Sequence, residues 1–132
     1  IDVLADTLLR GKVRKMAIDI VIDDDCFDEG ADGWCETNET KRKPRYFTIT
    51  LGSHLWQYKE RGADVFHKEM LTTLAHEMVH VAQMATGLMH YKDAENVEYE
   101  TRLYKLSECE YDDRPWEQEA FALQDALYNL CV

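Results

Sequence analysis

The feature that most constrains the fold is a long amphipathic segment in the middle of the chain. Apolar side chains recur there every three or four positions, which is the spacing that gives an α-helix one buried face. The members of this stripe are Phe66, Met70, Leu71, Leu74, Met78, Val81 and Ala82. Asp64 is a favoured N-cap residue, and Gly87 is typical of the position just after a helix. We therefore predict a central helix from Asp64 to Ala85.

That helix carries the pattern His76-Glu77-Met78-Val79-His80, which has the form HExxH. Two residues four positions apart lie on nearly the same helix face, with Cβ atoms about 5–6 Å apart. Two imidazoles at that separation can bind one Zn²⁺, so we expect His76 and His80 to be metal ligands. Glu77 is the expected catalytic base, which takes a proton from a zinc-bound water. The alternative is two ordinary histidines beside a solvated glutamate.

A catalytic zinc ion needs a third protein ligand and keeps its fourth position for water. The candidates are Glu117 and Glu119, on the last predicted helix, and His90. The apolar stripe of that helix places Glu119 nearer the core-facing side and Glu117 at its flank, which slightly favours Glu119. His54 and His67 are weaker candidates, and His67 faces away from the motif on the central helix.

The rest of the chain predicts two strands and two further helices around the central one. The expected helices are Asp2–Lys15 and Pro115–Leu130, and the expected strands are Lys15–Asp23 and Arg45–Leu51. Cys26–Lys43 is predicted to be a loop or a loose hairpin, and Leu88–Asp113 a long polar connection with short helical pieces. This order predicts an α+β fold, with helices packed on a small sheet in a single domain over residues 1–132.

Charge and cysteine usage limit the partners and the compartment. The 26 acidic and 15 basic residues give a net charge of -11, which makes nucleic-acid binding by this domain alone unlikely and disfavours anionic membranes. No apolar run approaches the roughly 20 residues of a membrane helix. A Cys26–Cys35 disulfide is conceivable, but free thiols and a cytoplasmic location are favoured. The chain begins at Ile1, so the N-terminus is expected to be incomplete.

At this point the residues resemble the zincin metallopeptidases. His76–Ala85 (HEMVHVAQMA) and Arg114–Ala120 (RPWEQEA) are similar to the SprT-like metallopeptidases of phages and bacteria, over about a quarter of the chain. The resemblance implies a minimal zincin-like fold with the HExxH helix at its centre. In glutamate-type zincins the third ligand opens a Glu-x-x-Ala pattern, which implies Glu117 here. Phe121 departs from that pattern, because those families often carry Asp or Asn at its position.

The resemblance also implies an activity, namely hydrolysis of peptide bonds in a protein or peptide substrate with Zn²⁺ as the cofactor. Arg45–Leu51 is the strand expected to bind the substrate in extended form, by β-augmentation. The alternative function is a zinc-stabilised protein-binding module without catalytic activity. Several residues are candidates for stabilising the oxyanion: Tyr91, Tyr99, Tyr104, Tyr111 and Arg114. The sequence does not choose among them, and it leaves the oligomeric state open.

Overall fold

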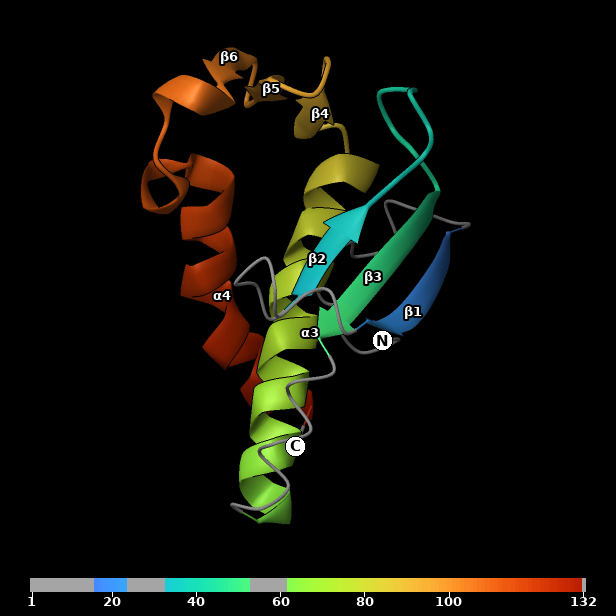
Figure 1. Ribbon diagram of the computed structural model, residues 1–132, viewed down its shortest axis with the longest axis vertical. Coiled ribbons are helices and arrows are strands. Elements are labelled where there is room, and N and C mark those ends of the chain that lie inside the picture. The colour runs from blue at the N-terminus through green and yellow to red at the C-terminus, as the bar shows by residue number, and fades with distance from the viewer. Residues whose placement is uncertain (1–15, 24–32, 53–61, 132) are drawn as a thin grey trace.

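The computed structural model describes residues 16–23, 33–52 and 62–131. It has an α+β architecture in which two helices pack against two small sheets, which confirms the predicted fold class (Figure 1). The expected helix at Asp2–Lys15 lies outside the described residues. Within the described part of the chain, no helix is both long and apolar enough to cross a membrane.

The first sheet has three strands in the order β1-β3-β2, with bounds Ala17–Asp23 for β1, Gly33–Glu36 for β2 and Tyr46–Gly52 for β3. β1 runs parallel to β3, and β2 runs antiparallel to it. Alternate side chains of β3 enter the core at Phe47, Ile49 and Leu51. The strands predicted at Lys15–Asp23 and Arg45–Leu51 are therefore confirmed as β1 and β3.

Strand β2 corrects the prediction of a loop or loose hairpin over Cys26–Lys43. Four residues are too few to establish a two-residue alternation in the sequence, so β2 is defined by its pairing with β3. Its first residue, Gly33, allows a close approach: a Cβ there would lie 2.7 Å from the Thr50 carbonyl oxygen and 3.2 Å from the Thr73 methyl group. A glycine at this position therefore lets β2 lie directly against the central helix.

Helix α3 (Ala63–Ala85) is the predicted central helix, and it lies between the first sheet and helix α4 (Figure 1). It begins one residue before the predicted N-cap Asp64, which instead occupies the first turn, where a negative charge complements the helix dipole. The helix ends as expected, with Gly87 in the left-handed region at φ 79°. The Arg45 guanidinium donates to the Ala85 carbonyl at 2.9 Å and so satisfies an end group of the helix.

The chain between the two helices is folded: the prediction of a long polar connection over Leu88–Asp113 missed three strands, while its short helical pieces agree with two 3₁₀ turns. It forms an antiparallel sheet of β4 (Met89–Tyr91), β5 (Asn96–Tyr99) and β6 (Arg102–Lys105), followed by 3₁₀ turns η2 (Leu106–Glu108) and η3 (Tyr111–Asp113). These strands are only three or four residues long, so their sequences are too short to show the two-residue alternation of a strand.

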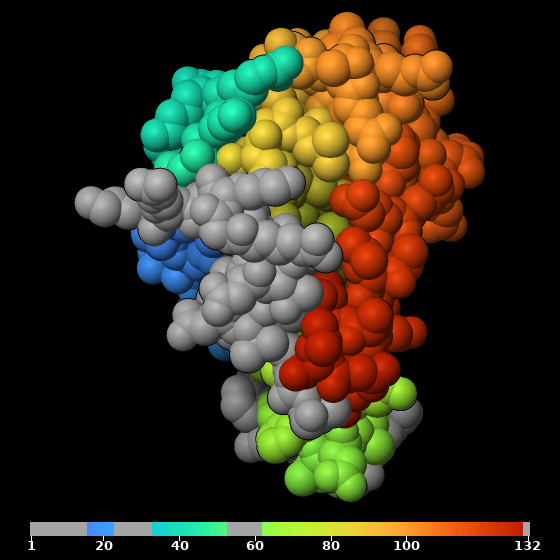
Figure 2. Space-filling model, turned by 180° about the vertical axis from the view of Figure 1, so that it is seen from behind, coloured from blue at the N-terminus to red at the C-terminus, as the bar shows by residue number. Residues whose placement is uncertain are grey.

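Helix α4 (Pro115–Cys131) is the predicted last helix, and it packs along α3. Figure 2 shows α4 (red) on the face opposite to the view of Figure 1, with the first turns of α3 (green) at one end of the molecule. Trp116 in its first turn is buried, and its ring lies 6.0 Å from that of Tyr99 and 5.5 Å from that of Tyr104. The second sheet thus anchors the beginning of α4.

Candidate metal centre

His76 and His80 lie one turn apart in the buried half of α3. Each residue is only 7% exposed, and the ring centroids are 5.0 Å apart with the rings nearly perpendicular. The apolar neighbours Met78, Val79 and Val81 hold this turn in the core, so the two rings have little freedom to turn away. The predicted helical placement of the motif is confirmed.

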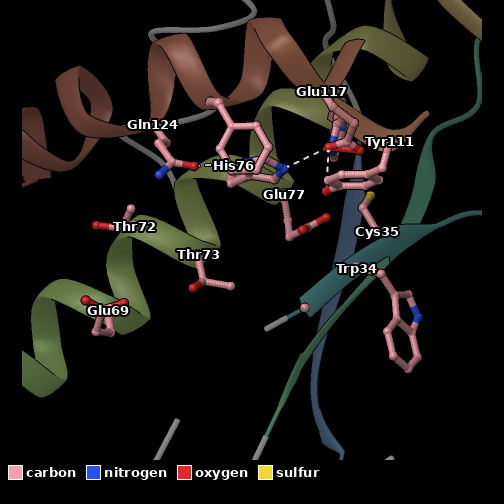
Figure 3. Close-up of a pocket in the computed structure, with 13 residues that line it drawn as sticks. Trp34, Cys35, Glu69, Thr72, Thr73, His76, Glu77, Tyr111, Glu117 and Gln124 are labelled. Carbon is pink, nitrogen blue, oxygen red and sulfur yellow. Dashed lines mark hydrogen bonds and ion pairs between the residues drawn. The ribbon is translucent and has the colours of Figure 1, made fainter. Parts of the chain in front are cut away.

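Glu117 completes a three-residue group with the two histidines. Its Oε1 atom lies 2.9 Å from His76 Nε2 and 2.8 Å from His80 Nε2 (Figure 3). The three possible ligand atoms lie within 4.8 Å of one another, and all three residues are buried. Two ligands of a tetrahedral zinc ion are about 3.3 Å apart, so a small outward movement would admit the ion. This group can therefore hold a metal ion.

Glu119, the rival that the apolar stripe favoured, is turned away from the two histidines. Its Oε1 atom accepts a hydrogen bond from Gln83 Nε2 at 2.9 Å. The predicted stripe is only partly buried, because Leu123 and Leu130 are 37% and 56% exposed. The face of α4 that packs on α3 holds the other predicted stripe residues, Trp116, Ala120 and Leu127, together with Glu117.

The glutamine side chains beside the two imidazoles orient the rings. Gln124 Oε1 lies 2.9 Å from His76 Nδ1, and Gln83 Oε1 lies 2.8 Å from His80 Nδ1. In each ring Nε2 is therefore the nitrogen turned toward Glu117. The sequence reasoning missed both glutamines, although their spacing was a usable signal. Gln83 is one turn beyond His80, and Gln124 is two turns beyond Glu117 on the same helix face.

The two Nε2 atoms and Glu117 Oε1 can lie this close together only with a positive charge among them, either a proton or a metal ion. With Nδ1–H donated to a glutamine, a neutral imidazole presents its Nε2 lone pair to the Glu117 oxygen, and two acceptors at 2.8 Å repel each other. Burial alone would lower the pKa of His80, but Glu117 raises it. Burial alone would raise the pKa of Glu117, but the two histidines lower it to about 2. A bound cation satisfies the same atoms, so the donor set fits a metal ion such as zinc.

Glu77 is buried beside the three-residue group without joining it. The residue is 5% exposed, and its Oε2 atom has no hydrogen-bond partner among the described residues. Burial raises the pKa of Glu77, although the neighbouring His80 and His76 oppose that shift. A buried carboxylate oxygen without a partner is costly to keep. It is therefore the kind of acceptor expected to receive a proton or a hydrogen bond from a molecule entering the site.

These residues open onto a pocket of about 650 Å³ between α3, α4 and β2 (Figure 3). Aromatic side chains from separate elements line it: Trp34 of β2, Tyr111 of η3 and Phe121 of α4. The Tyr111 hydroxyl donates to Glu117 Oε1 at 3.0 Å, and the Phe121 ring packs edge-on against His76 at 4.6 Å. Phe121, the departure from the family pattern, is thus part of the pocket wall.

Several other predicted residues lie away from the group. His90, the last candidate third ligand, is in β4 opposite Glu98, and it lines a different pocket. His67 is exposed on the first half of α3, while His54 lies outside the described residues. Cys35 is a free thiol, and its proposed partner Cys26 also falls outside the described part.

The prediction that Arg45–Leu51 binds the substrate by β-augmentation is wrong. Strand β3, which contains most of Arg45–Leu51, is paired on both sides, by β1 and by β2. Both of its edges are therefore occupied, and it cannot accept a further strand. Strand β2 pairs only with β3 among the described residues, and Gly33, Trp34 and Cys35 line the pocket.

Comparisons of the chain with protein-family models, with curated proteins and with solved structures found no match. The centre is therefore characterised by its own geometry, as a buried group of two histidines and a glutamate that can hold a metal ion.

Proposed function

We propose that the chain is a zinc-dependent metallopeptidase of the zincin class, similar to the SprT-like metallopeptidases. The observation that carries the proposal is the combination of three converging ligand atoms with the unpartnered Glu77 Oε2 in one open pocket. His76, His80 and Glu117 are the proposed zinc ligands. Two imidazoles and one carboxylate form one of the usual ligand sets of catalytic zinc.

The chemistry follows from where these side chains lie. Zinc, when bound, supplies Lewis acidity that polarises a substrate carbonyl and acidifies water. Glu77 takes the proton from the attacking water, and its raised pKa helps it to hold that proton until it passes to the leaving amine. Burial and the nearby Glu117 raise the pKa of Tyr111, so this phenol stays protonated, and its O–H can turn from Glu117 Oε1 to donate to the developing oxyanion.

The substrate is proposed to bind as an extended chain along β2. The backbone of that strand supplies donors and acceptors for β-augmentation, and its first three residues line the pocket. A side chain entering beside the metal centre would contact Phe121 and Tyr111, which are 49% and 47% exposed. This wall favours an apolar or aromatic side chain next to the cleaved bond.

The alternative is a zinc-stabilised binding module without catalytic activity. It requires a closed centre with a fourth protein ligand. Among the described residues the group has three members, and it faces the pocket rather than the core. This openness favours the hydrolase, and a coordination number measured on the zinc-loaded protein separates the two proposals.

The decisive experiment compares metal content and cleavage in the wild type and in Glu77→Gln. We expect one zinc ion per chain in both proteins and cleavage of a casein-type substrate by the wild type. Loss of the base should reduce cleavage by about 10²–10⁴-fold. A zinc-loaded wild type that cleaves neither casein nor an unstructured peptide library would refute the peptidase. Loss of zinc in Glu77→Gln would contradict the division of roles between base and ligands.

A further inference from the structure

Gln83 is buried between the two helices, and its side chain makes three hydrogen bonds. It is 2% exposed. Its Nε2 atom donates to the Trp116 carbonyl at 3.0 Å and to Glu119 Oε1 at 2.9 Å, while its Oε1 atom faces His80 Nδ1 at 2.8 Å. Both Nε2 partners are acceptors, so the orientation of the amide is determined. His80 must therefore carry its proton on Nδ1, which leaves Nε2 as the metal-binding nitrogen.

We infer that Glu119 and Gln83 form a relay that positions His80 and strengthens it as a metal ligand. The inference rests on the proposed metal centre and assigns a role to the glutamate that does not reach it. A carboxylate that accepts from one end of an amide polarises it, so that its oxygen becomes a stronger acceptor for Nδ1–H. A stronger acceptor at Nδ1 makes the imidazole a better donor to a metal at Nε2.

The surroundings of Glu119 are suited to this role. Glu119 is half-buried and lines a second pocket of about 600 Å³ together with Gln83, whereas His80 lines the first pocket. Burial and the Glu119 carboxylate, to which the phenol is hydrogen-bonded, both raise the pKa of the adjacent Tyr99, so Glu119 is held from the Tyr99 side as well as by Gln83. The relay thus extends from the second pocket to the metal centre through one buried side chain.

The two histidines differ in what lies behind the glutamine that holds each ring. Gln124, which contacts His76, is only half-buried. Among the described residues it makes no hydrogen bond to a carboxylate. His76 is therefore held by an amide alone, while His80 is held by an amide with a carboxylate behind it. The difference makes Gln124 an internal reference for the contribution of Glu119.

The test measures zinc affinity by competition with a chelator, together with the melting temperature of each metal-free protein. We expect Gln83→Met to bind zinc about 10–100-fold more weakly than the wild type, which is the usual effect of losing such a partner. The zinc affinity of Glu119→Gln should lie between those of Gln83→Met and the wild type, and its metal-free melting temperature should change little. Glu100→Gln is the matched control, because it removes one charge at the same pocket without touching Gln83. It should bind zinc like the wild type.

A double variant separates the relay from simple packing. Gln83→Glu combined with Glu119→Gln exchanges the amide and the carboxylate, so His80 Nδ1 again has a strong acceptor while the Trp116 carbonyl loses its donor. We expect zinc affinity to return to that of the wild type or better, despite a lower melting temperature. Affinity as weak as in Gln83→Met would overturn the relay, as would Glu119→Gln with unchanged affinity. A wild type that binds no zinc would instead refute the proposed metal centre itself.

Discussion

The two halves of helix α3 have the same amphipathic pattern but different surroundings. Residues 63–74 contain no buried side chain, whereas ten of residues 75–85 are buried. The first half forms one end of the molecule, and the second half lies between β2 and β3 on one side and α4 on the other (Figures 1 and 2). The HExxH motif is in the second half only.

This difference explains why the motif can form a site. A histidine in solvent keeps many rotamers, so its ring gains little by pointing at a partner. The rings of His76 and His80 are instead fixed by packing, by a glutamine on one side and by Glu117 on the other. The exposed half offers a comparison within the same helix, because His67 there is exposed and has the Phe66 ring 6.0 Å away.

The largest expected effect comes from removing one histidine from each half. We expect His80→Ala to lose stoichiometric zinc, because one of three ligands is missing. The rise in melting temperature that zinc gives the wild type should disappear with it. His67→Ala is the matched control and should retain both zinc and the rise. Metal analysis and thermal unfolding with and without zinc check this prediction, and zinc loss in both variants would contradict it.

An apolar truncation in each half should separate their contributions to stability. Met78 is 1% exposed, whereas Val65 is 36% exposed. We expect Met78→Ala to reduce the free energy of unfolding by about 2–5 kcal/mol, because it leaves a cavity in the core. Val65→Ala should change it by no more than about 0.5 kcal/mol. Urea unfolding of the metal-free proteins measures both values, and equal losses would show that the two halves are packed alike.

The same comparison shows how far sequence reasoning could reach. Apolar periodicity predicted α3 and α4 nearly to the residue, and the HExxH spacing predicted which face carries the histidines. Periodicity does not report which half of a helix is covered, because that depends on β2 and α4, which come from distant parts of the chain. The choice of Glu117 over Glu119 came from the family template, since the predicted stripe also included Leu123 and Leu130, which prove to be exposed.

The missed features share a physical cause. Strands β2, β4, β5 and β6 are three or four residues long, so they are stabilised by pairing rather than by a pattern of their own. Gln83 was assigned no role from the sequence, yet it is buried, and three partners satisfy its amide. A buried polar residue of this kind becomes recognisable only when its partners on α4 are known.

The smallest expected effect is the pH dependence of the metal-free protein. Glu117 has a pKa lowered from 4.5 to about 2, so its contribution is present above pH 4.5 and is lost as the pH falls toward 2. His80 has a pKa raised above 6.5, so its contribution is full below that value and is lost as the pH rises through the raised pKa. Glu77, whose pKa is also raised, adds to the loss at higher pH. We expect the melting temperature to fall by a few degrees on each side of an acidic optimum.

Zinc should reverse the alkaline side of this profile, because the metal binds unprotonated imidazole and replaces the proton between His80 and Glu117. The stabilisation by zinc should therefore grow as the pH rises from about 5.5 to 8. In Glu117→Gln both limbs of the metal-free profile should shrink, since the carboxylate that titrates on the acid limb is gone, and with it the charge that raises the pKa of His80. His67→Ala should reproduce the wild-type profile. If the alkaline limb of the metal-free profile is unchanged in Glu117→Gln, the pairing of Glu117 with His80 does not control that limb.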